Sequence, residues 1–286
     1  MSLKNSWAAI ENKSLDTRLL QALREDRARE DVTSKALIPA NESGEAEFIA
    51  RAKGVLCGIA VAERCFRLFD PKARFDRCCD DGAALKRGMV IARVRGRLRS
   101  LFAVERVALN LLCRLSGIAT LTSQFVNQAS PYGVRIFDTR KTTPLWRDLE
   151  KYAVAAGGGC NHRQDLASAC FIKDNHVYAC GGIQAALERL FSMKKVPRPV
   201  IVEARTKKEV LIASKYPVDL ILLDNMSPRR IRSISMCIDK GIELEISGGV
   251  NLGNVREYAQ AGASRISIGA LTHSVKVLDI ALDYRS

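Results

Sequence analysis

The sequence predicts an α/β protein in which a small α+β domain precedes an α/β barrel with too few strands to close. Two patterns predict it: an irregular mixture of helices and strands in the first part of the chain, and a regular strand–helix alternation in the second. A chain of 286 residues is long enough to bury one large α/β core or two smaller ones. Apolar residues make up 47% and charged residues 27%, which excludes a disordered or fibrous chain.

The first part of the chain mixes the two kinds of element. Apolar residues recur at helical spacing over residues 16–29, and residues 59–69 predict a second, short helix. Residues 31–39 have the composition of a loop. Three segments predict strands, the last two separated by the turn signal DDGAALKRG: residues 45–59, 73–78 and 89–96. This order indicates a small α+β domain, and a long helix over about 101–129 is expected to lead to the second part.

From residue 134 onwards, short β-type runs alternate with helical segments. The runs predict six strands: VRIFD (134–138), ACFIK (169–173), PVIVE (199–203), DLILLD (219–224), ELEIS (243–247) and RISIG (265–269). Strand–helix repetition predicts a parallel sheet, and the absence of a dinucleotide-binding glycine fingerprint favours a barrel over an open sheet. A full barrel has eight strands, so this one is incomplete. We expect domains over 1–115 and 116–286, with the last helix packing back on the first domain.

The composition narrows the location and the partners. The N-terminal segment lacks the uninterrupted apolar core of a signal peptide, and charged residues interrupt the apolar stretch 101–121, so neither secretion nor a membrane span is expected. Nine scattered cysteines without zinc-site spacing indicate free thiols in the cytoplasm. The net charge of +14 fits either a nucleic acid or a small, multiply anionic substrate. Dispersed cations and only 6% aromatic residues argue against nucleic acid, but charge alone does not decide.

Polar or glycine residues stand at the carboxyl end of every predicted barrel strand. In chain order they are Asp138-Thr139-Arg140-Lys141, Lys173-Asp174, Glu203, Asp224, Ser247-Gly248-Gly249 and Gly269. In a barrel these ends converge on one face, which is where barrel enzymes carry their catalytic residues. Each residue taken singly is more often a solvated loop residue, whereas six such ends in succession predict one polar site.

The last two strand–helix units predict a phosphate site. SGGVN and SIGALTHS each offer small residues and backbone N–H groups at a helix start, where barrels commonly bind phosphate. His273 could stiffen the second of these loops, although a surface histidine is the plainer interpretation. Glu203 and Asp224, at the ends of neighbouring strands, suit ribose hydroxyls or a Mg²⁺ ion shared with substrate phosphates. Alternatively, these two carboxylates simply pair with the nearby cations.

Several of these motifs carry a resemblance to a known family. DTRKTTP, GGGCNHR, FIKDNH, IVEA, LILLDN, EISGG and IGALTHS, preceded by EDVTS and ERVALNLLCRLSGIAT, closely resemble the quinolinate phosphoribosyltransferases. The likeness runs from about residue 20 to 282, with the motifs in the same order and at similar spacing. It implies an open α/β sandwich joined to an incomplete α/β barrel. It also implies a Mg²⁺-dependent reaction in NAD biosynthesis: quinolinate and 5-phosphoribosyl-1-pyrophosphate give nicotinate mononucleotide, CO₂ and pyrophosphate.

The resemblance also implies roles for individual residues. The quinolinate carboxylates are expected at Arg140, His162, Arg163 and Lys173, with Thr139 and Lys141 lining the site. Glu203 and Asp224 match the ribose and metal positions. The 5-phosphate is expected at two loops that comprise Ser247, Gly248 and Gly249 and Ile268, Gly269 and Ala270, with His273 beside them.

The implied assembly is a homodimer with shared active sites, in which Arg106 comes from the partner subunit; whether dimers assemble further into hexamers is left open. Two rival functions also stay open. One is a related phosphoribosyltransferase of the same fold with another acceptor, including the molybdenum-transport-associated homologue. The other is a nucleic-acid-binding protein, which only the net charge suggests.

Overall fold

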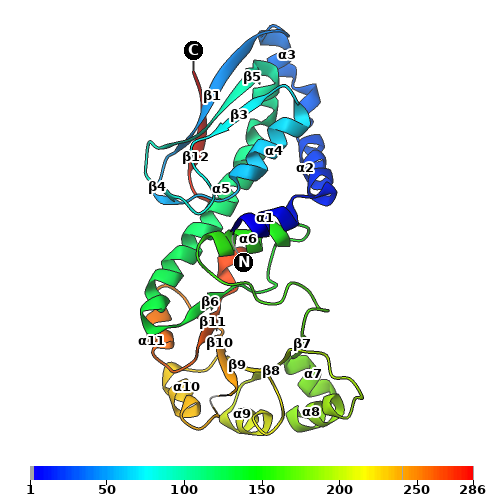
Figure 1. Ribbon diagram of the computed structural model, residues 1–286, viewed down its shortest axis with the longest axis vertical. Coiled ribbons are helices and arrows are strands. Elements are labelled where there is room, and N and C mark those ends of the chain that lie inside the picture. Colours follow the sequence, from blue (N-terminus) through cyan, green and yellow to red (C-terminus); the bar gives the residue numbers. More distant parts are fainter. Residues whose placement is uncertain (1–2, 240, 286) are drawn as a thin grey trace. The chain divides into compact units, whose positions relative to one another are not determined.

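The computed structural model describes residues 3–239 and 241–285, which form two compact units (Figure 1). The first unit contains the chain up to Ser123, Thr143–Gly158, and the segment from Ser274 onwards. The second unit contains Gln124–Thr142 and Gly159–His273. The units therefore interleave along the chain, and helix α5 (Leu98–Ala129) begins in the first and ends in the second. No helix in the described part of the chain is both long and apolar enough to span a membrane.

The first unit is built on a four-stranded antiparallel sheet with the strand order β12-β1-β5-β3. Its strands are β1 (Ser43–Ala50), β3 (Arg74–Arg77), β5 (Val90–Arg97) and β12 (Ile280–Arg285). A short second sheet pairs β2 (Gly54–Val55) with β4 (Ala84–Leu85). The expected last helix is wrong, because the C-terminal segment is the strand β12. Ile280, Leu282 and Tyr284 alternate with the more exposed Ala281, Asp283 and Arg285, which is the period of a strand. Ile280 and Leu282 are buried, and Tyr284 packs on Phe102.

The two faces of this sheet differ sharply in chemistry. On one face, Phe48 of β1 and Phe75 of β3 pack with Phe66 of α4, with ring centroids 5.6–6.1 Å apart. Residues that alternate with these carry charges and form cross-strand ion pairs, such as Arg93 with Glu47 at 2.9 Å and Arg285 with Glu47 at 2.6 Å. One face is thus the core and the other is polar, as is usual for a two-layer α+β unit.

Side chains cap two of the helices that belong to the first unit. The helices are α1 (Leu3–Ile10), α2 (Lys13–Glu25), α3 (Val32–Leu37), α4 (Ile59–Phe69), most of α5, and α6 (Arg147–Ala156), with a 3₁₀ turn at Ala28–Glu30; a second 3₁₀ turn, Ser130–Tyr132, lies in the second unit. Asn12 caps α2 by accepting the N–H groups of Ser14 and Leu15. The segment 31–39, expected to be a loop, contains α3 instead, because the Asp31 carboxylate caps its first turn.

The second unit is a six-stranded parallel sheet, and all six predicted strands are present. They are β6 (Arg135–Phe137), β7 (Cys170–Ile172), β8 (Val200–Ala204), β9 (Leu220–Asp224), β10 (Glu243–Ser247) and β11 (Arg265–Ser267). The strands pair in the order β6-β11-β10-β9-β8-β7. The two end strands, β6 and β7, do not pair with each other in the described part of the chain, so the sheet does not close into a barrel. In Figure 1 these strands follow one another in an arc. The predicted incomplete barrel is therefore confirmed.

Helices cover the outer side of this arc (Figure 1). They are α7 (Asp174–Ala179), α8 (Ile183–Phe191), α9 (Lys207–Ala213), α10 (Pro228–Ser235) and α11 (Val255–Ala259), whereas the short helix α12 (Ala270–His273) follows the carboxyl end of β11. The strands between them are rich in fully buried residues such as Val202, Ile221 and Ile246. The strands are therefore fixed by packing on both sides, and side chains at their carboxyl ends are held by a rigid scaffold.

At Gly157, in the GGGCNHR motif, the packing inside the first unit requires a glycine. A Cβ atom there would lie 2.3 Å from the backbone oxygen of Ala119 and 2.7 Å from Cβ of Thr122, both in α5. Backbone cannot yield as a flexible side chain can, so α6 and α5 would be pushed apart. This glycine therefore serves close helix packing.

We expect Gly157→Ala to lower the free energy of unfolding by about 1–3 kcal/mol, the usual cost of overpacking a core. Gly96→Ala is the matched control, because a Cβ there meets its nearest neighbours at an ordinary 3.5–3.6 Å. Guanidinium unfolding of both variants measures the difference. Equal stability of the two variants would contradict the packing argument.

Candidate active site

A cavity of about 770 Å³ opens at the carboxyl ends of the barrel strands. Every site residue predicted from the sequence, apart from Arg106, lines it. They are Thr139, Arg140, Lys141, His162, Arg163, Lys173, Glu203, Asp224, Ser247, Gly248, Gly249, Ile268, Gly269, Ala270 and His273. The cavity therefore lies where the converging strand ends predicted it.

The loop that carries His162 is tied to the end of β6 by a buried carboxylate. Asp138 is 0% exposed and accepts the backbone N–H of His162 at 2.8 Å and the side-chain amide of Asn161 at 2.6 Å. The same segment forms a parallel bridge between Cys160 and Phe137. A charged acceptor makes stronger hydrogen bonds than a neutral one, so the position of His162 and Arg163 is well fixed.

Two guanidinium groups in the cavity lack full compensation by acids. The Nε atom of Arg140 is buried and has no hydrogen-bond partner among the described residues. Arg163 donates to the backbone oxygen of Ala169 at 3.0 Å and lies over the ring of Phe171, 4.9 Å from its centroid. Burial, followed by the nearby Arg140 guanidinium, lowers the pKa of Arg163 from its usual value. Like charges held this close are relieved by an anion bound between them.

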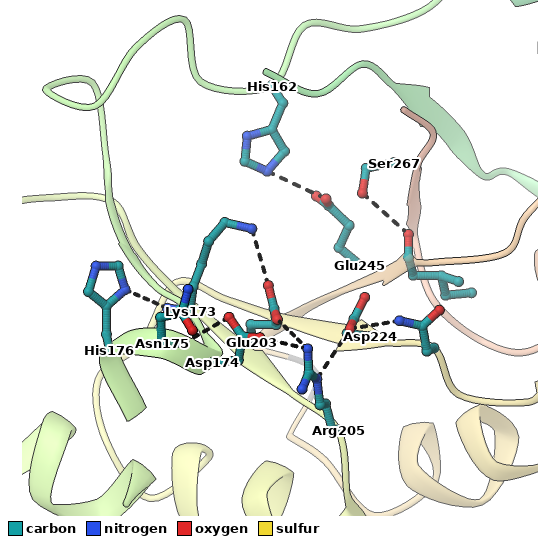
Figure 2. A network of polar contacts seen from close by, with 12 residues as sticks. His162, Lys173, Asp174, Asn175, His176, Glu203, Arg205, Asp224, Glu245 and Ser267 are labelled. Atoms are coloured by element: carbon teal, nitrogen blue, oxygen red, sulfur yellow. Dashed lines mark hydrogen bonds and ion pairs between the residues drawn. The ribbon is translucent and has the colours of Figure 1, made fainter. Parts of the chain in front are cut away.

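His162 is oriented by its own neighbours. Its Nδ1 accepts the backbone N–H of Arg163 at 2.8 Å, and its ring stacks on Phe171 with the two planes 21° apart. Its Nε2 lies 3.4 Å from Oε1 of Glu245, as Figure 2 shows. The imidazole, the guanidinium of Arg163 and the ring of Phe171 thus form one packed group at the cavity wall.

The acidic pair lies on the neighbouring strands β8 and β9. Glu203 is paired with Lys173 at 3.2 Å, and Asp224 with the Nε of Arg205 at 3.4 Å (Figure 2). Arg205 also contacts Asp174 at 2.8 Å, and the three nearby carboxylates, Asp174 first, raise the pKa of Arg205. The alternative that these acids pair with the surrounding cations is therefore confirmed.

Glycines let the backbone approach the cavity at the ends of β10 and β11. At Gly248, φ is +90°, and a Cβ atom would lie 2.2 Å from the side-chain oxygen of Asn225. At Gly269, a Cβ atom would lie 3.0 Å from both His273 Nε2 and Lys141 Cδ. The hydroxyl of Thr272 donates to the backbone oxygen of Lys141 at 2.7 Å and joins the β11 loop to the β6 loop. Both loops can therefore present backbone N–H groups to a ligand.

Residues near the cavity that were not predicted from the sequence include Phe171, Asn225 and Glu245, which line it, and Arg205, which pairs with Asp224. Asn225 adopts a left-handed backbone with φ of +54°, and its side chain donates to Asp224 at 2.9 Å. Glu245 is 0% exposed yet borders the cavity. In ELEIS it alternates with Leu244 and Ile246, as a polar residue of a half-buried strand does, so the pattern alone did not mark it as a site residue.

Arg106 does not line the cavity. It lies in α5, its side chain is 65% exposed, and the guanidinium is 3.9 Å from the neighbouring Glu105 carboxylate. A role for Arg106 therefore stays a prediction that depends on a second subunit.

The fold and the cavity define an α/β-barrel enzyme with an anion-binding active site. Residues 31–116 match the model of the quinolinate phosphoribosyl transferase N-terminal domain, and residues 118–283 match that of the C-terminal domain. The chain belongs to the quinolinate phosphoribosyltransferase family, which confirms the resemblance predicted from its motifs.

Individual relatives agree with this placement. A probable nicotinate-nucleotide pyrophosphorylase (carboxylating) of Bacillus subtilis is 40% identical over 259 residues, which cover 91% of this chain and 89% of the relative. Quinolinate phosphoribosyltransferase (decarboxylating) 1 of Nicotiana glauca is 40% identical and covers 88% of this chain and 77% of its own. The crystal structure of NadC from Streptococcus pyogenes superposes with a TM-score of 0.90 at 36% identity, covering 95% of this chain and 97% of that one.

Proposed function

We propose that this chain transfers the phosphoribosyl group of 5-phosphoribosyl-1-pyrophosphate to quinolinate and releases CO₂, giving nicotinate mononucleotide and pyrophosphate for NAD biosynthesis. One observation carries the proposal: Arg140 and Arg163 face the same cavity as the acids Glu203 and Asp224 and the glycine loops. The cations suit a dicarboxylate, the acids suit a sugar and a cation, and the loops suit a phosphate. The three parts of the cavity match the three chemical parts of the proposed substrates.

Quinolinate binding falls to the cations at the ends of β6 and β7. Arginine binds a carboxylate through its planar fork, which can hold both oxygens. Arg140 and Arg163 can therefore fix the ring plane, and Lys173 adds a point charge above the Phe171 ring, 4.4 Å from its centroid. The unbonded Nε of Arg140 gains a partner when a carboxylate binds.

The transfer step needs positioning more than a protein nucleophile. The pyridine nitrogen of quinolinate attacks C1 of the ribose with its lone pair, while the C1–oxygen bond breaks and its electrons leave with pyrophosphate. Charge develops on the sugar as an oxocarbenium-like centre, which Glu203 and Asp224 can stabilise because both lie at the same rim. The phosphate, held at Ser247–Gly249 and Ile268–Ala270, fixes the far end of the sugar.

Decarboxylation follows from the product of that step. The ribosylated ring nitrogen is cationic, so it stabilises the electron pair that remains at C2 when the C2–carboxylate bond breaks. CO₂ departs, and a proton then replaces it at C2. The protein needs only to hold the ring while its charge changes, which suits a cavity built from fixed cations.

Magnesium fits the acidic pair, and we propose that Glu203 and Asp224 hold it. Mg²⁺ is commonly bound by one or two carboxylates together with substrate phosphates. No group of three or more histidine, cysteine or acidic ligands suited to a metal occurs within residues 3–239 and 241–285, so substrate oxygens have to complete the coordination. When bound, Mg²⁺ would neutralise charge on the leaving pyrophosphate.

We further propose that the enzyme is a cytoplasmic homodimer with Arg106 completing the partner's site. The exposure of Arg106 supports the shared site, because an arginine without a strong ion pair is available to a neighbour. All nine cysteines are free, which supports a reducing compartment. Further assembly of dimers into hexamers is compatible with this arrangement.

The proposed reaction predicts CO₂ release from carboxyl-labelled quinolinate that depends on 5-phosphoribosyl-1-pyrophosphate. A relative that uses another acceptor would release none. In this assay Arg163→Ala and Lys173→Ala are expected to lower kcat/KM about 10- to 150-fold, because each loses a charged hydrogen bond to the substrate.

Arg198→Ala serves as the control for these two variants. Arg198 lies just before β8, at the opposite end of the barrel, and pairs with Asp219 at 2.9 Å. Its activity and the melting temperatures of all three variants should stay near wild type. Near-normal turnover of Arg163→Ala would remove that residue from the site.

The assignment of the acids predicts a selective effect of Asp224→Asn. The amide keeps the shape of the side chain but loses the charge that binds Mg²⁺ or the ribose hydroxyls. We expect KM for 5-phosphoribosyl-1-pyrophosphate to rise about tenfold or more, with KM for quinolinate little changed. Titrating each substrate at saturating levels of the other measures this. A selective loss of quinolinate affinity would contradict the assignment.

The shared-site proposal predicts complementation between two impaired variants. Arg106→Ala and Arg163→Ala should each retain at most about a tenth of wild-type activity as pure dimers. In a mixed dimer one pocket carries both lesions and the other carries neither. Unfolding the two variants together and refolding them should restore about a quarter of wild-type activity if subunits pair at random in a two-fold dimer. If Arg106 served the pocket of its own chain, mixing would restore nothing.

A further inference from the structure

The most unusual side chain of the barrel is Glu245, in the middle of β10. It is 0% exposed, and its neighbours in the strand, Leu244 and Ile246, are buried and apolar. It is nevertheless among the residues that line the cavity. A buried carboxylate is costly, and replacing a buried ion pair with apolar residues is often neutral or stabilising. Stability alone therefore does not explain its presence.

Two basic side chains from neighbouring segments lie beside this carboxylate, and of these Arg265 carries the balancing charge. Its Oε1 faces Nε2 of His162 at 3.4 Å, and its Oε2 faces Nε of Arg265 at 3.3 Å. Arg265 pairs with Glu243 at 2.8 Å and stacks on Phe137, 3.9 Å from the ring centroid. Glu245 and Arg265 are direct neighbours in the β10–β11 register, so the strands themselves hold this pair in place.

The contacts of His162 fix which of its nitrogens carries the proton. Nδ1 accepts the backbone N–H of Arg163, so it presents a lone pair there. The remaining nitrogen, Nε2, then carries the proton and points at Glu245 (Figure 2). The Glu245 carboxylate near Nε2 and the backbone N–H at Nδ1 together favour a single tautomer and hold the orientation of the ring.

We propose that Glu245 is a positioning residue for quinolinate, which acts by holding His162 as the Nε2-protonated tautomer. This inference rests on the proposed function, in which His162 and Arg163 receive a substrate carboxylate. Because the hydrogen bond to Nδ1 comes from the backbone of Arg163, a fixed imidazole also fixes the segment from which the Arg163 guanidinium extends. Arg265 balances the charge of Glu245, so the carboxylate orients the ring without repelling the dianionic substrate.

The geometry predicts that Glu245 affects one substrate only. His162 and Arg163 belong to the loop beside β6, whereas the acids proposed for the phosphoribosyl donor end β8 and β9. A change at Glu245 should therefore weaken quinolinate binding and spare the donor. A residue that merely stabilised the barrel would affect both substrates and the melting temperature together.

Glu245→Gln tests this, because glutamine keeps the shape and removes the charge. We expect quinolinate affinity, measured by calorimetry and as KM, to fall about tenfold, with donor affinity within about twofold of wild type. Glu243→Gln is the matched control: it lies two residues away on the same side of β10 and pairs with Arg135 and Arg265, but it does not line the cavity. Its quinolinate affinity should stay at the wild-type value. Equal effects of the two variants, or none at Glu245, would overturn the proposal.

A double-mutant cycle tests whether Glu245 acts through His162. If it does, adding Glu245→Gln to His162→Gln should cause little further loss of kcat/KM for quinolinate, since the ring to be oriented is gone. Losses that multiply independently would show that Glu245 works by another route and would refute the mechanism.

The tautomer of His162 can also be measured in the wild-type protein, so this test does not require that a Glu245 variant folds. The chain has only three histidines, so their ring ¹⁵N signals can be resolved, and His162→Gln identifies the signals of His162. The expected pattern is a protonated Nε2 and an unprotonated Nδ1. An Nδ1-protonated or doubly protonated ring would contradict the proposal.

The proposed function and the proposed role of Glu245 can be refuted separately. If wild-type protein releases no CO₂ from quinolinate, the proposed function is wrong, whatever the tautomer. If wild-type protein is active while Glu245→Gln binds quinolinate normally, the function stands and only the role of Glu245 is wrong.

Discussion

The geometry of the site depends on two hydrogen bonds that the buried carboxylate of Asp138 accepts from the segment Asn161–His162. The barrel lacks the strands that would close it between β6 and β7. In their place, Cys160 pairs with Phe137 in a single bridge, and Asp138 extends that contact with two charged hydrogen bonds. One fully buried acceptor therefore fixes the backbone from which His162 and Arg163 extend. The gap in the barrel is thus also the place that carries two of the cations proposed to bind quinolinate.

Bringing these cations together in one cavity is electrostatically unfavourable, and other contacts have to offset this. Burial and, after it, the nearby Arg140 guanidinium lower the pKa of Arg163, and the Nε of Arg140 is buried without a hydrogen-bond partner among the described residues. Aromatic and backbone contacts offset part of the cost, since Arg163 lies on Phe171 and donates to Ala169. Such uncompensated charge is characteristic of functional sites, where affinity for the ligand matters more than stability of the empty protein.

Much of the fold and of the site could be predicted because both follow from short-range patterns. Strand–helix alternation gave the six barrel strands, and strand ends converge in any parallel barrel, so Glu203 and Asp224 were placed without knowledge of tertiary contacts. The errors have equally physical causes. The capped helix after Asp31 was missed because one Asx cap outweighed a loop-like composition. The C-terminal strand was misjudged because its partner, β1, lies far away in the sequence. Glu245 and Asn225 act through a buried ion pair and a left-handed backbone, which spacing does not reveal.

The order of the strands around the barrel explains why one cavity can serve two different substrates. From β7 the rim carries Lys173, then the acids of β8 and β9, then the glycine loops of β10 and β11, and finally Arg140 after β6. The acids and glycines adjoin, as a ribose and its phosphate do, while the cations occupy both ends of the row. Because β6 and β7 flank the gap, these two ends come from its opposite sides. On the proposed assignment, an acceptor bound between them would touch both sides of the gap and meet the donor at the acidic strands. The incomplete barrel would thus provide two adjacent binding sites along a single rim.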